Sequence, residues 1–141
     1  MKDIPDSVFR VPIKVVAEDI DGMNHVNNAV YLNWMIRAAV AHSDSLGFTF
    51  AKFKETGGMF VVRRHEIDYL KSAVLGDTLT MVTWSTPMDG AKATREYMLT
   101  RDSDNARILE AKTFWVYVDL ATGRPRTIPH TVSEAFTKSK P

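Results

Sequence analysis

Residues 19–34, DIDGMNHVNNAVYLNW, hold the side chains of this sequence that are best suited to chemistry. Two carboxylates, one histidine and three asparagines fall within ten residues, directly before an apolar run. Polar side chains at that density are costly to bury unless each of them is hydrogen-bonded. The stretch is therefore either an exposed loop or a functional site.

The chemistry that this stretch favours is acyl transfer. From Val30 the apolar residues follow helical spacing, so the polar loop ends where a helix begins. The first backbone N–H groups of a helix have no partner inside the helix, and the helix dipole adds partial positive charge there. Such N–H groups can stabilise an oxyanion while a nearby carboxylate attacks or activates water. Asp21, which lies seven residues before Asn28, is placed for the second role.

Each polar residue of the loop also has an ordinary structural interpretation. Asp19 and Asp21 could form turns or caps, and His25 could bond to the backbone. A metal site made of these three residues has little support, because no second histidine cluster accompanies it. A Ser-His-Asp triad has little support either, because no serine lies in the glycine pattern of a nucleophile elbow. The asparagines could supply turn and capping amides: Asn24, Asn27 and Asn28.

The composition narrows the class of protein. The 141 residues suit one domain, which we take as residues 1–141. A net charge of +1 gives no reason to expect nucleic acid or an anionic membrane as partner. The absence of cysteine excludes disulfides and thiolate chemistry. The N-terminal stretch lacks the apolar segment of a signal peptide, and no apolar run approaches the ~20 residues of a membrane span. We expect a cytoplasmic protein.

One long helix is expected to follow the polar loop. Two apolar stripes run along it from Val30, so we expect it to be largely buried. Asn27 or Asn28 suits its N-cap, and Gly47 suits its end.

The rest of the chain predicts strands. Residues 8–16 alternate in hydropathy, and Pro12 marks that strand as an edge or a strand start. A short terminal helix is expected at residues 131–138. Four further strands are expected between clear turn signals, at residues 60–70, 78–85, 93–101 and 107–120.

This order, β-α-β-β-β-β, predicts an α+β fold. The economical arrangement is a curved antiparallel sheet of about five strands wrapped around the one long central helix. Such a sheet is unclosed and leaves two edges exposed, which invites pairing with a second copy of the chain. We therefore expect a homodimer.

The loop motif resembles a known signature. Asp-x-Asp-x-x-x-His-Val-Asn-Asn-x-x-Tyr-x-x-Trp, which runs from Asp19 to Trp34, is similar to the motif of hotdog-fold acyl thioesterases. The branch it resembles includes 4-hydroxybenzoyl-CoA thioesterase, the Tol-Pal-associated acyl-CoA thioesterase and the plant acyl-ACP thioesterases. Two later segments are similar to that family's second and last strands, and the likeness covers residues 8–130: Phe60-Val-Val-Arg63 and Val116-x-Val-Asp-x-x-Thr-Gly-Arg-Pro125.

This resemblance implies a hotdog fold paired into dimers and often tetramers. It implies hydrolysis of acyl-CoA to a carboxylic acid and free CoA, with Asp21 as nucleophile or general base. The N–H at the helix start, that of Asn28, would polarise the thioester carbonyl, and His25 matches the motif's histidine. CoA is part of the substrate, and neither a metal nor a separate cofactor is implied. Candidate substrate-binding residues are Asn27, Tyr31, Arg63, Arg64 and Lys71.

The three basic residues are candidates only because they lie close together in the sequence. Arg63, Arg64 and Lys71 lie on one expected strand and the turn after it, where they could meet the CoA phosphates. Solvated strand and turn positions explain them equally well.

The sequence departs from its relatives at two places. Met23 stands where the plant enzymes carry an asparagine, and Ile36 or Arg37 stands where several bacterial relatives carry a glutamate. Asp21 is then the one well-supported acid. An alternative is a non-catalytic hotdog module that binds acyl-CoA or acyl carrier protein, since fold does not fix function. A hydratase or dehydratase on the same fold is a weaker alternative. The acyl group, the carrier, the role of Asp21 and the choice between dimer and tetramer stay open.

Overall fold

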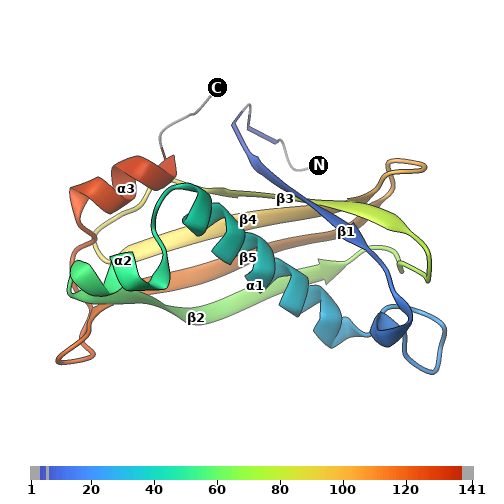
Figure 1. Ribbon diagram of the computed structural model, residues 1–141, viewed down its shortest axis with the longest axis horizontal. Helices are drawn as coiled ribbons and strands as arrows, with labels where there is room; N and C mark the ends of the chain where they lie inside the picture. Colours follow the sequence, from blue (N-terminus) through green and yellow to red (C-terminus); the bar gives the residue numbers. More distant parts are fainter. Residues whose placement is uncertain (1–3, 6, 138–141) are drawn as a thin grey trace.

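The computed structural model of the protein describes residues 4, 5 and 7–137, and these form one antiparallel sheet with helices on one of its faces (Figure 1). The sheet order is β1-β3-β4-β5-β2. The three middle strands therefore follow one another in the chain as hairpins, while β1 and β2 form the edges. The five strands are β1 (Phe9–Lys14), β2 (Gly58–Tyr69), β3 (Thr78–Ser85), β4 (Lys92–Arg101) and β5 (Arg107–Asp119).

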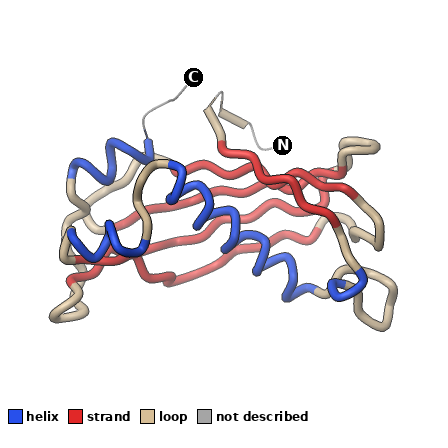
Figure 2. The backbone as a smooth tube through the Cα atoms, viewed as in Figure 1, coloured by secondary structure: helices blue, strands red, loops and turns tan. Residues whose placement is uncertain are grey.

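Helix α1 (Asn28–Ser45) crosses the sheet obliquely, and two shorter helices lie near its C-terminal end (Figure 2). These are α2 (Phe50–Glu55) and α3 (His130–Thr137), and a short 3-10 helix, η1 (Ala17–Asp19), follows β1. The prediction of an α+β hotdog fold, with a curved sheet around one long helix, is confirmed. The predicted bounds of β3 are confirmed, and the other strand and helix bounds lie within two residues of those expected, although Lys138 is outside the described residues.

The sequence reading missed both η1 and α2. Helix α2 has only six residues, too few to show a helical period. It begins because the Thr49 hydroxyl accepts the N–H of Lys52 at 3.2 Å. Element η1 has three residues and is held by the Asp19 carboxylate, which accepts the N–H of Val16 at 3.0 Å. Local side-chain caps, not periodicity, therefore define these two turns.

Both ends of α1 carry the predicted signals. The Asn27 side chain accepts the N–H of Ala29 at 2.9 Å, so Asn27 is the N-cap. Gly47, with a φ of 86°, lies directly after the C-cap residue Leu46, in the left-handed conformation that ends many helices. The helix thus begins and ends where its sequence requires.

The expectation that α1 is largely buried is wrong for the single chain. One stripe, which includes Tyr31, Trp34 and Met35, packs against the sheet. The other stripe is open, with Ile36 44% and Val40 54% exposed. The physical reason is geometric, since one sheet can cover only one side of a helix. The outer stripe needs some other surface to bury it.

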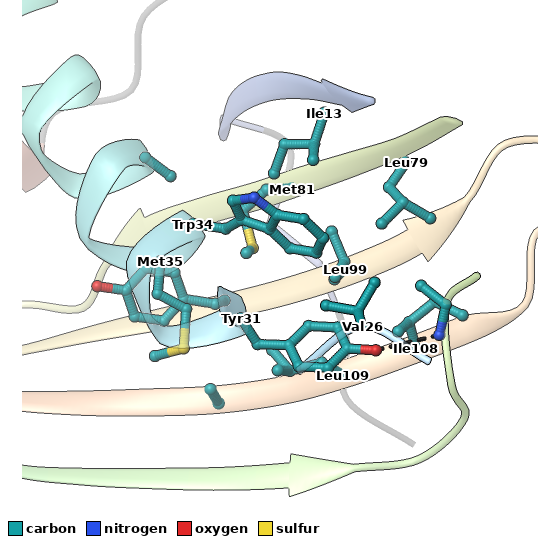
Figure 3. Packing of buried hydrophobic residues seen from close by; sticks show 14 of the residues in the cluster. Ile13, Val26, Tyr31, Trp34, Met35, Leu79, Met81, Leu99, Ile108 and Leu109 are labelled. Atoms are coloured by element: carbon teal, nitrogen blue, oxygen red, sulfur yellow. Dashed lines mark hydrogen bonds between the residues drawn. The ribbon is translucent and has the colours of Figure 1, made fainter. Parts of the chain in front are cut away.

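The main core lies between α1 and the sheet. Figure 3 shows Trp34 of the helix beside Met81 and Leu99, which come from β3 and β4, and Met35 belongs to the same cluster. Met35, Met81 and Leu99 are all fully buried. Complete burial of such a side chain contributes roughly 1.5–3 kcal/mol. This packing fixes the position of α1, and with it the position of the polar loop at its N-terminus.

The two sheet edges differ. Strand β1 carries Pro12, as predicted for an edge, because proline cannot donate to a neighbouring strand. Strand β2 has twelve residues, pairs only with β5 and has an irregularity between Val62 and Arg64. Val61 and Val62 are 36% and 41% exposed. A long edge with exposed valines is the more open of the two to pairing.

Candidate active site

The polar loop forms a closed five-residue turn. Residues Ile20 and Val26 pair across it, and the N–H of Asp21 donates to the carbonyl of His25 at 2.9 Å. Asn24 takes the left-handed conformation, with a φ of 63°, which asparagine tolerates better than most residues. The turn therefore projects from the end of a local bridge whose geometry is fixed by backbone hydrogen bonds.

Asp21 and Asp19 have different surroundings. The Asp21 carboxylate is half-buried and accepts one hydrogen bond, from the N–H of Met23 to Oδ1 at 2.8 Å. Its Oδ2 accepts none from the described residues. Asp19 instead bonds to the backbone of Val16, at the far side of η1. The Asp19 carboxylate thus stabilises a turn, whereas Oδ2 of Asp21 is free to accept a hydrogen bond from water or substrate.

One backbone N–H at the start of α1 is open. Among the first helical residues, the N–H of Ala29 donates to the Asn27 side chain and the N–H of Val30 donates to the Asn27 carbonyl, both at 2.9 Å. The N–H of Asn28 donates to no described residue. Because it also lies at the positive end of the helix dipole, this N–H is the natural position for an oxyanion.

These groups face a common cavity of about 210 Å³, which we call the loop hollow. It brings together five of the predicted site residues, with walls from the loop, α1 and the β2–β3 connection. The predicted residues that line it are Asp21, His25, Asn28, Tyr31 and Lys71.

Tyr31 joins the floor of the loop hollow to the β2–β3 connection. Its hydroxyl accepts the N–H of Ala73 at 3.0 Å, a bond drawn as a dashed line in Figure 3. The carbonyl of Ala73 in turn accepts the N–H of Val26 at 3.0 Å. Burial raises the pKa of the Tyr31 hydroxyl, which therefore stays protonated near neutral pH. The two bonds hold residues that are far apart in sequence against the polar loop.

The structure does not bring all predicted binding residues to the hollow. Asn27 is occupied by its capping bond. Arg64 forms an ion pair with Glu66 and lies over the ring of Phe114, with 5.6 Å between the guanidinium carbon and the ring centre. Arg64 also lies five residues before the end of β2, or about 16 Å along an extended strand. Arg63 and Arg64 therefore form no cluster with Lys71 within one chain.

Several walls of the loop hollow were not predicted as site residues. Met23 is 74% exposed, Tyr69 packs its ring 5.6 Å from that of Tyr31, and Leu70 and Ser72 complete the rim. Tyr69, Leu70 and Ser72 reach the site through the Tyr31–Ala73 contact, which joins segments about forty positions apart, whereas Met23 belongs to the loop itself. No local pattern signals such a contact.

A second cavity lies at the opposite end of α1. Its volume is about 220 Å³, and α1, α2, α3 and the sheet all contribute walls. We call it the aromatic pocket, because six aromatic side chains line it: Phe48, Phe50, Phe53, Phe60, Trp115 and Phe136. The outer residues Ile36 and Val40 of α1 also border it.

The described residues contain neither a metal-binding group of side chains nor a membrane-spanning helix. No group of three or more histidine, aspartate or glutamate side chains is placed to hold a metal ion. None of the helices in the described part of the chain has the length and apolar character needed to cross a membrane.

A curved antiparallel sheet wrapped around one long helix, with a carboxylate loop ahead of an open helix N-terminus, defines the hotdog class. Residues 15–136 match the family described as the thioesterase-like superfamily. The chain belongs to that superfamily, which confirms the family predicted from the loop motif.

The relatives include named thioesterases. The chain is 34% identical over 133 residues to the acyl-CoA thioesterase YbgC of Haemophilus influenzae, covering 93% of this chain and 96% of that protein. It is 30% identical over 117 residues to the long-chain acyl-CoA thioesterase FadM of Escherichia coli, covering 81% and 86% respectively. The crystal structure of Slr0204, a 1,4-dihydroxy-2-naphthoyl-CoA thioesterase from Synechocystis, superposes with a TM-score of 0.84. It shares 18% identity and covers 92% of this chain and 95% of its own, a likeness of fold.

Proposed function

We propose that this protein hydrolyses acyl-CoA thioesters in the loop hollow, with Asp21 as the catalytic carboxylate. The observation that carries the proposal is the open N–H of Asn28 in the same cavity as the half-buried Asp21 carboxylate. Its family membership and its thioesterase relatives support the same reaction class.

The proposed reaction begins with the thioester carbonyl at the start of α1. The carbonyl oxygen accepts the N–H of Asn28, which stabilises the negative charge that develops there. Asp21 then takes a proton from a water molecule that attacks the carbonyl carbon, or attacks that carbon itself. In the first route the C–S bond breaks and the proton held by Asp21 passes to the sulfur, so CoA leaves as the thiol. In the second route the C–S bond breaks to leave an acyl–Asp21 anhydride; water hydrolyses this anhydride to the free acid and the Asp21 carboxylate, and supplies the proton that the CoA thiolate takes up.

The remaining groups of the hollow have supporting roles. Lys71 places a positive charge at the wall, suited to a phosphate of CoA. The exposed His25 borders the hollow within reach of substrate, and the Tyr31 hydroxyl still carries a hydrogen that it can donate. CoA enters as part of the substrate, and the proposed reaction uses no separate cofactor.

A homodimer is proposed as the active unit. The unpaired edge of β2 and the exposed outer stripe of α1 both lie open in the single chain. Pairing of two β2 edges would satisfy the free backbone groups and could bring Arg63 of one chain toward the site of the other. A tetramer and a cytoplasmic location stay predictions.

The dimer can be tested through its concentration dependence. Activity per chain should fall as the protein is diluted below its dissociation constant, in parallel with the loss of dimer by light scattering. Full specific activity in a verified monomer would remove the dimer from the proposal.

Thiol release from a panel of acyl-CoA substrates tests the reaction itself. The panel should span short, medium and long acyl chains and aryl groups. Steady release of free CoA from any member supports hydrolysis. Binding of acyl-CoA without any release across the panel would instead favour the non-catalytic module.

A further inference from the structure

The aromatic pocket contains a buried positive charge that thioester hydrolysis does not use. Arg95 of β4 lines the pocket and is only 6% exposed. It shares the inner face of the strand with Ala93 and Tyr97, both buried. A buried guanidinium is expensive unless an anion or several hydrogen bonds compensate it. The surroundings of Arg95 therefore show what compensates its charge.

The side chains that contact the Arg95 guanidinium among the described residues are all uncharged. Its Nη1 donates to Nδ1 of His42 at 2.9 Å and to the hydroxyl of Thr83 at 3.1 Å. The Thr83 hydroxyl has already given its own hydrogen to the carbonyl of Glu96 at 2.8 Å, so it can only accept from Arg95. The ring of Phe136 lies 5.8 Å from the guanidinium carbon. These contacts orient the charge, but none of them neutralises it.

His42 cannot supply the missing anion, and it is not a second cation. Burial, together with the charge of Arg95, lowers the pKa of His42 to about 4. The ring is therefore neutral near pH 7, with Nδ1 as the acceptor. Within the part of the chain that the structure describes, Arg95 forms no ion pair. Asp44, the acidic residue on the pocket lining, is exposed and is not its partner.

Two nitrogens of Arg95 remain available to a ligand. The recorded hydrogen bonds use Nη1 alone, so Nε and Nη2 donate to no described residue. No fully buried side-chain nitrogen or oxygen among the described residues lacks a partner. These two nitrogens are therefore not sealed off and keep access to the pocket that Arg95 lines. Adjacent guanidinium N–H groups fit the two oxygens of a carboxylate.

We propose that the aromatic pocket binds an organic carboxylate, with its apolar body among the rings and its carboxylate on Arg95. The pocket volume of about 220 Å³ is more than ten times the roughly 10–15 Å³ that one water needs. A medium-length chain or an aryl ring therefore fits. Thioester hydrolysis as proposed above releases a carboxylate of this kind, and the far end of a dicarboxylic acyl group would be a second source.

The first arm of the test measures binding without any thioester. Octanoate is titrated into the wild-type protein and Arg95→Met, with calorimetry and the intrinsic tryptophan fluorescence as readouts; Trp115, one of the three tryptophans, lies on the pocket wall. Octanoate should bind wild type at least about tenfold more tightly than Arg95→Met, the effect of losing a charge-assisted hydrogen bond. 1-Octanol, which has no charge, should bind both proteins alike. Arg95→Lys, which keeps the charge but not the fork, should fall between them.

The second arm distinguishes the source of the carboxylate. Asn28 and His42, which contacts Arg95, lie fourteen residues apart on α1, or about 21 Å, so only a long acyl chain could span the two cavities. Hexadecanedioyl-CoA and hexadecanoyl-CoA differ only in a distal carboxylate, and kcat/KM for each is compared in wild type and Arg95→Met. A selective loss of about tenfold for hexadecanedioyl-CoA assigns Arg95 to the acyl tail. Octanoate selectivity without that loss assigns it to the free acid.

The proposal is overturned if Arg95→Met changes neither octanoate binding nor the preference for hexadecanedioyl-CoA over hexadecanoyl-CoA. Arg95→Met should remain folded, because it removes a costly buried charge and leaves the Thr83 hydroxyl bonded to the carbonyl of Glu96. Circular dichroism and the melting temperature verify this. Failure of thioester hydrolysis leaves the octanoate arm intact, so the two proposals can fail separately.

Discussion

The two ends of α1 carry two cavities of similar size and opposite character. The loop hollow at the N-terminal end is built from the polar turn, the start of α1 with its open N–H, and the β2–β3 connection. The aromatic pocket at the C-terminal end is built from three helices and the sheet, around one buried charge. Under the two proposals made above, one helix presents a site for chemistry at its N-terminus and a carboxylate-binding site at its C-terminus.

The largest effect is expected at Asp21, the carboxylate of the loop hollow. Asp21→Asn keeps the volume of the side chain and removes its basicity, so turnover of acyl-CoA should fall at least roughly a hundredfold. Steady-state thiol release measures this, and acyl-CoA affinity should change little. Asp19→Asn is the matched control, because the Asp19 carboxylate bonds to the N–H of Val16 beside η1 and does not line the loop hollow. Near-normal turnover in Asp21→Asn, together with loss in Asp19→Asn or His25→Ala, would mean that the loop has been assigned wrongly.

The second prediction concerns Tyr31, whose hydroxyl holds the β2–β3 connection against the loop hollow. Tyr31→Phe removes the acceptor of the buried Ala73 N–H while keeping the ring. An unsatisfied buried N–H costs about 1–3 kcal/mol, so the free energy of unfolding should fall by that amount in urea titration. Tyr69→Phe serves as the control, because its exposed hydroxyl forms only a long contact of 3.5 Å. Equal stability of the two variants would show that the Tyr31 bond contributes little.

The third test concerns the aromatic end and its dependence on pH. The folded pKa of His42, about 4, lies below the ordinary value of 6.5, so the unfolded chain takes up a proton first as pH falls. The neutral ring thus stabilises the fold above pH 6.5, and this contribution is lost progressively between pH 6.5 and 4. At pH 5 the loss relative to pH 7.5 should be about 2 kcal/mol.

Other groups also titrate in this range, so the measurement is a difference. Urea unfolding of wild type and His42→Gln at both pH values isolates the contribution of His42. Glutamine can still accept from Arg95 but does not titrate. Identical pH profiles for the two proteins would place His42 in contact with water instead of in the interior.

The loop was predictable because its signals are contiguous. Neighbouring residues in the sequence were enough to predict the two ends of α1, at Asn27 and Gly47, and the carboxylate ahead of it, Asp21. The same holds for Pro12 on an edge strand. The fold class followed from the order of these elements. Contacts between distant segments, such as Tyr31 with the Ala73 backbone, leave no local trace.

One residue of the aromatic pocket, Arg95, could have been identified from the sequence. In the strand KATREYMLTR, Arg95 has the same parity as Ala93, Tyr97 and Leu99, so it interrupts the apolar face of a strand. A charge at such a position is a candidate for a buried functional group. The companions of Arg95 come from α1, α3 and β3, and no sequence period could have identified them.

The place of β2 in the sheet has a consequence for synthesis of the chain. Gly58 and Tyr69, at the ends of β2, pair with Asp119 and Leu109 of β5, so β2 leaves the ribosome well before its neighbour exists. At 5–20 residues per second, the fifty residues from Tyr69 to Asp119 take on the order of 3–10 seconds. During that time both edges of a valine-bearing strand are unpaired. Completion of the sheet therefore waits until β5 has been made, because β2 pairs with no other strand among the described residues.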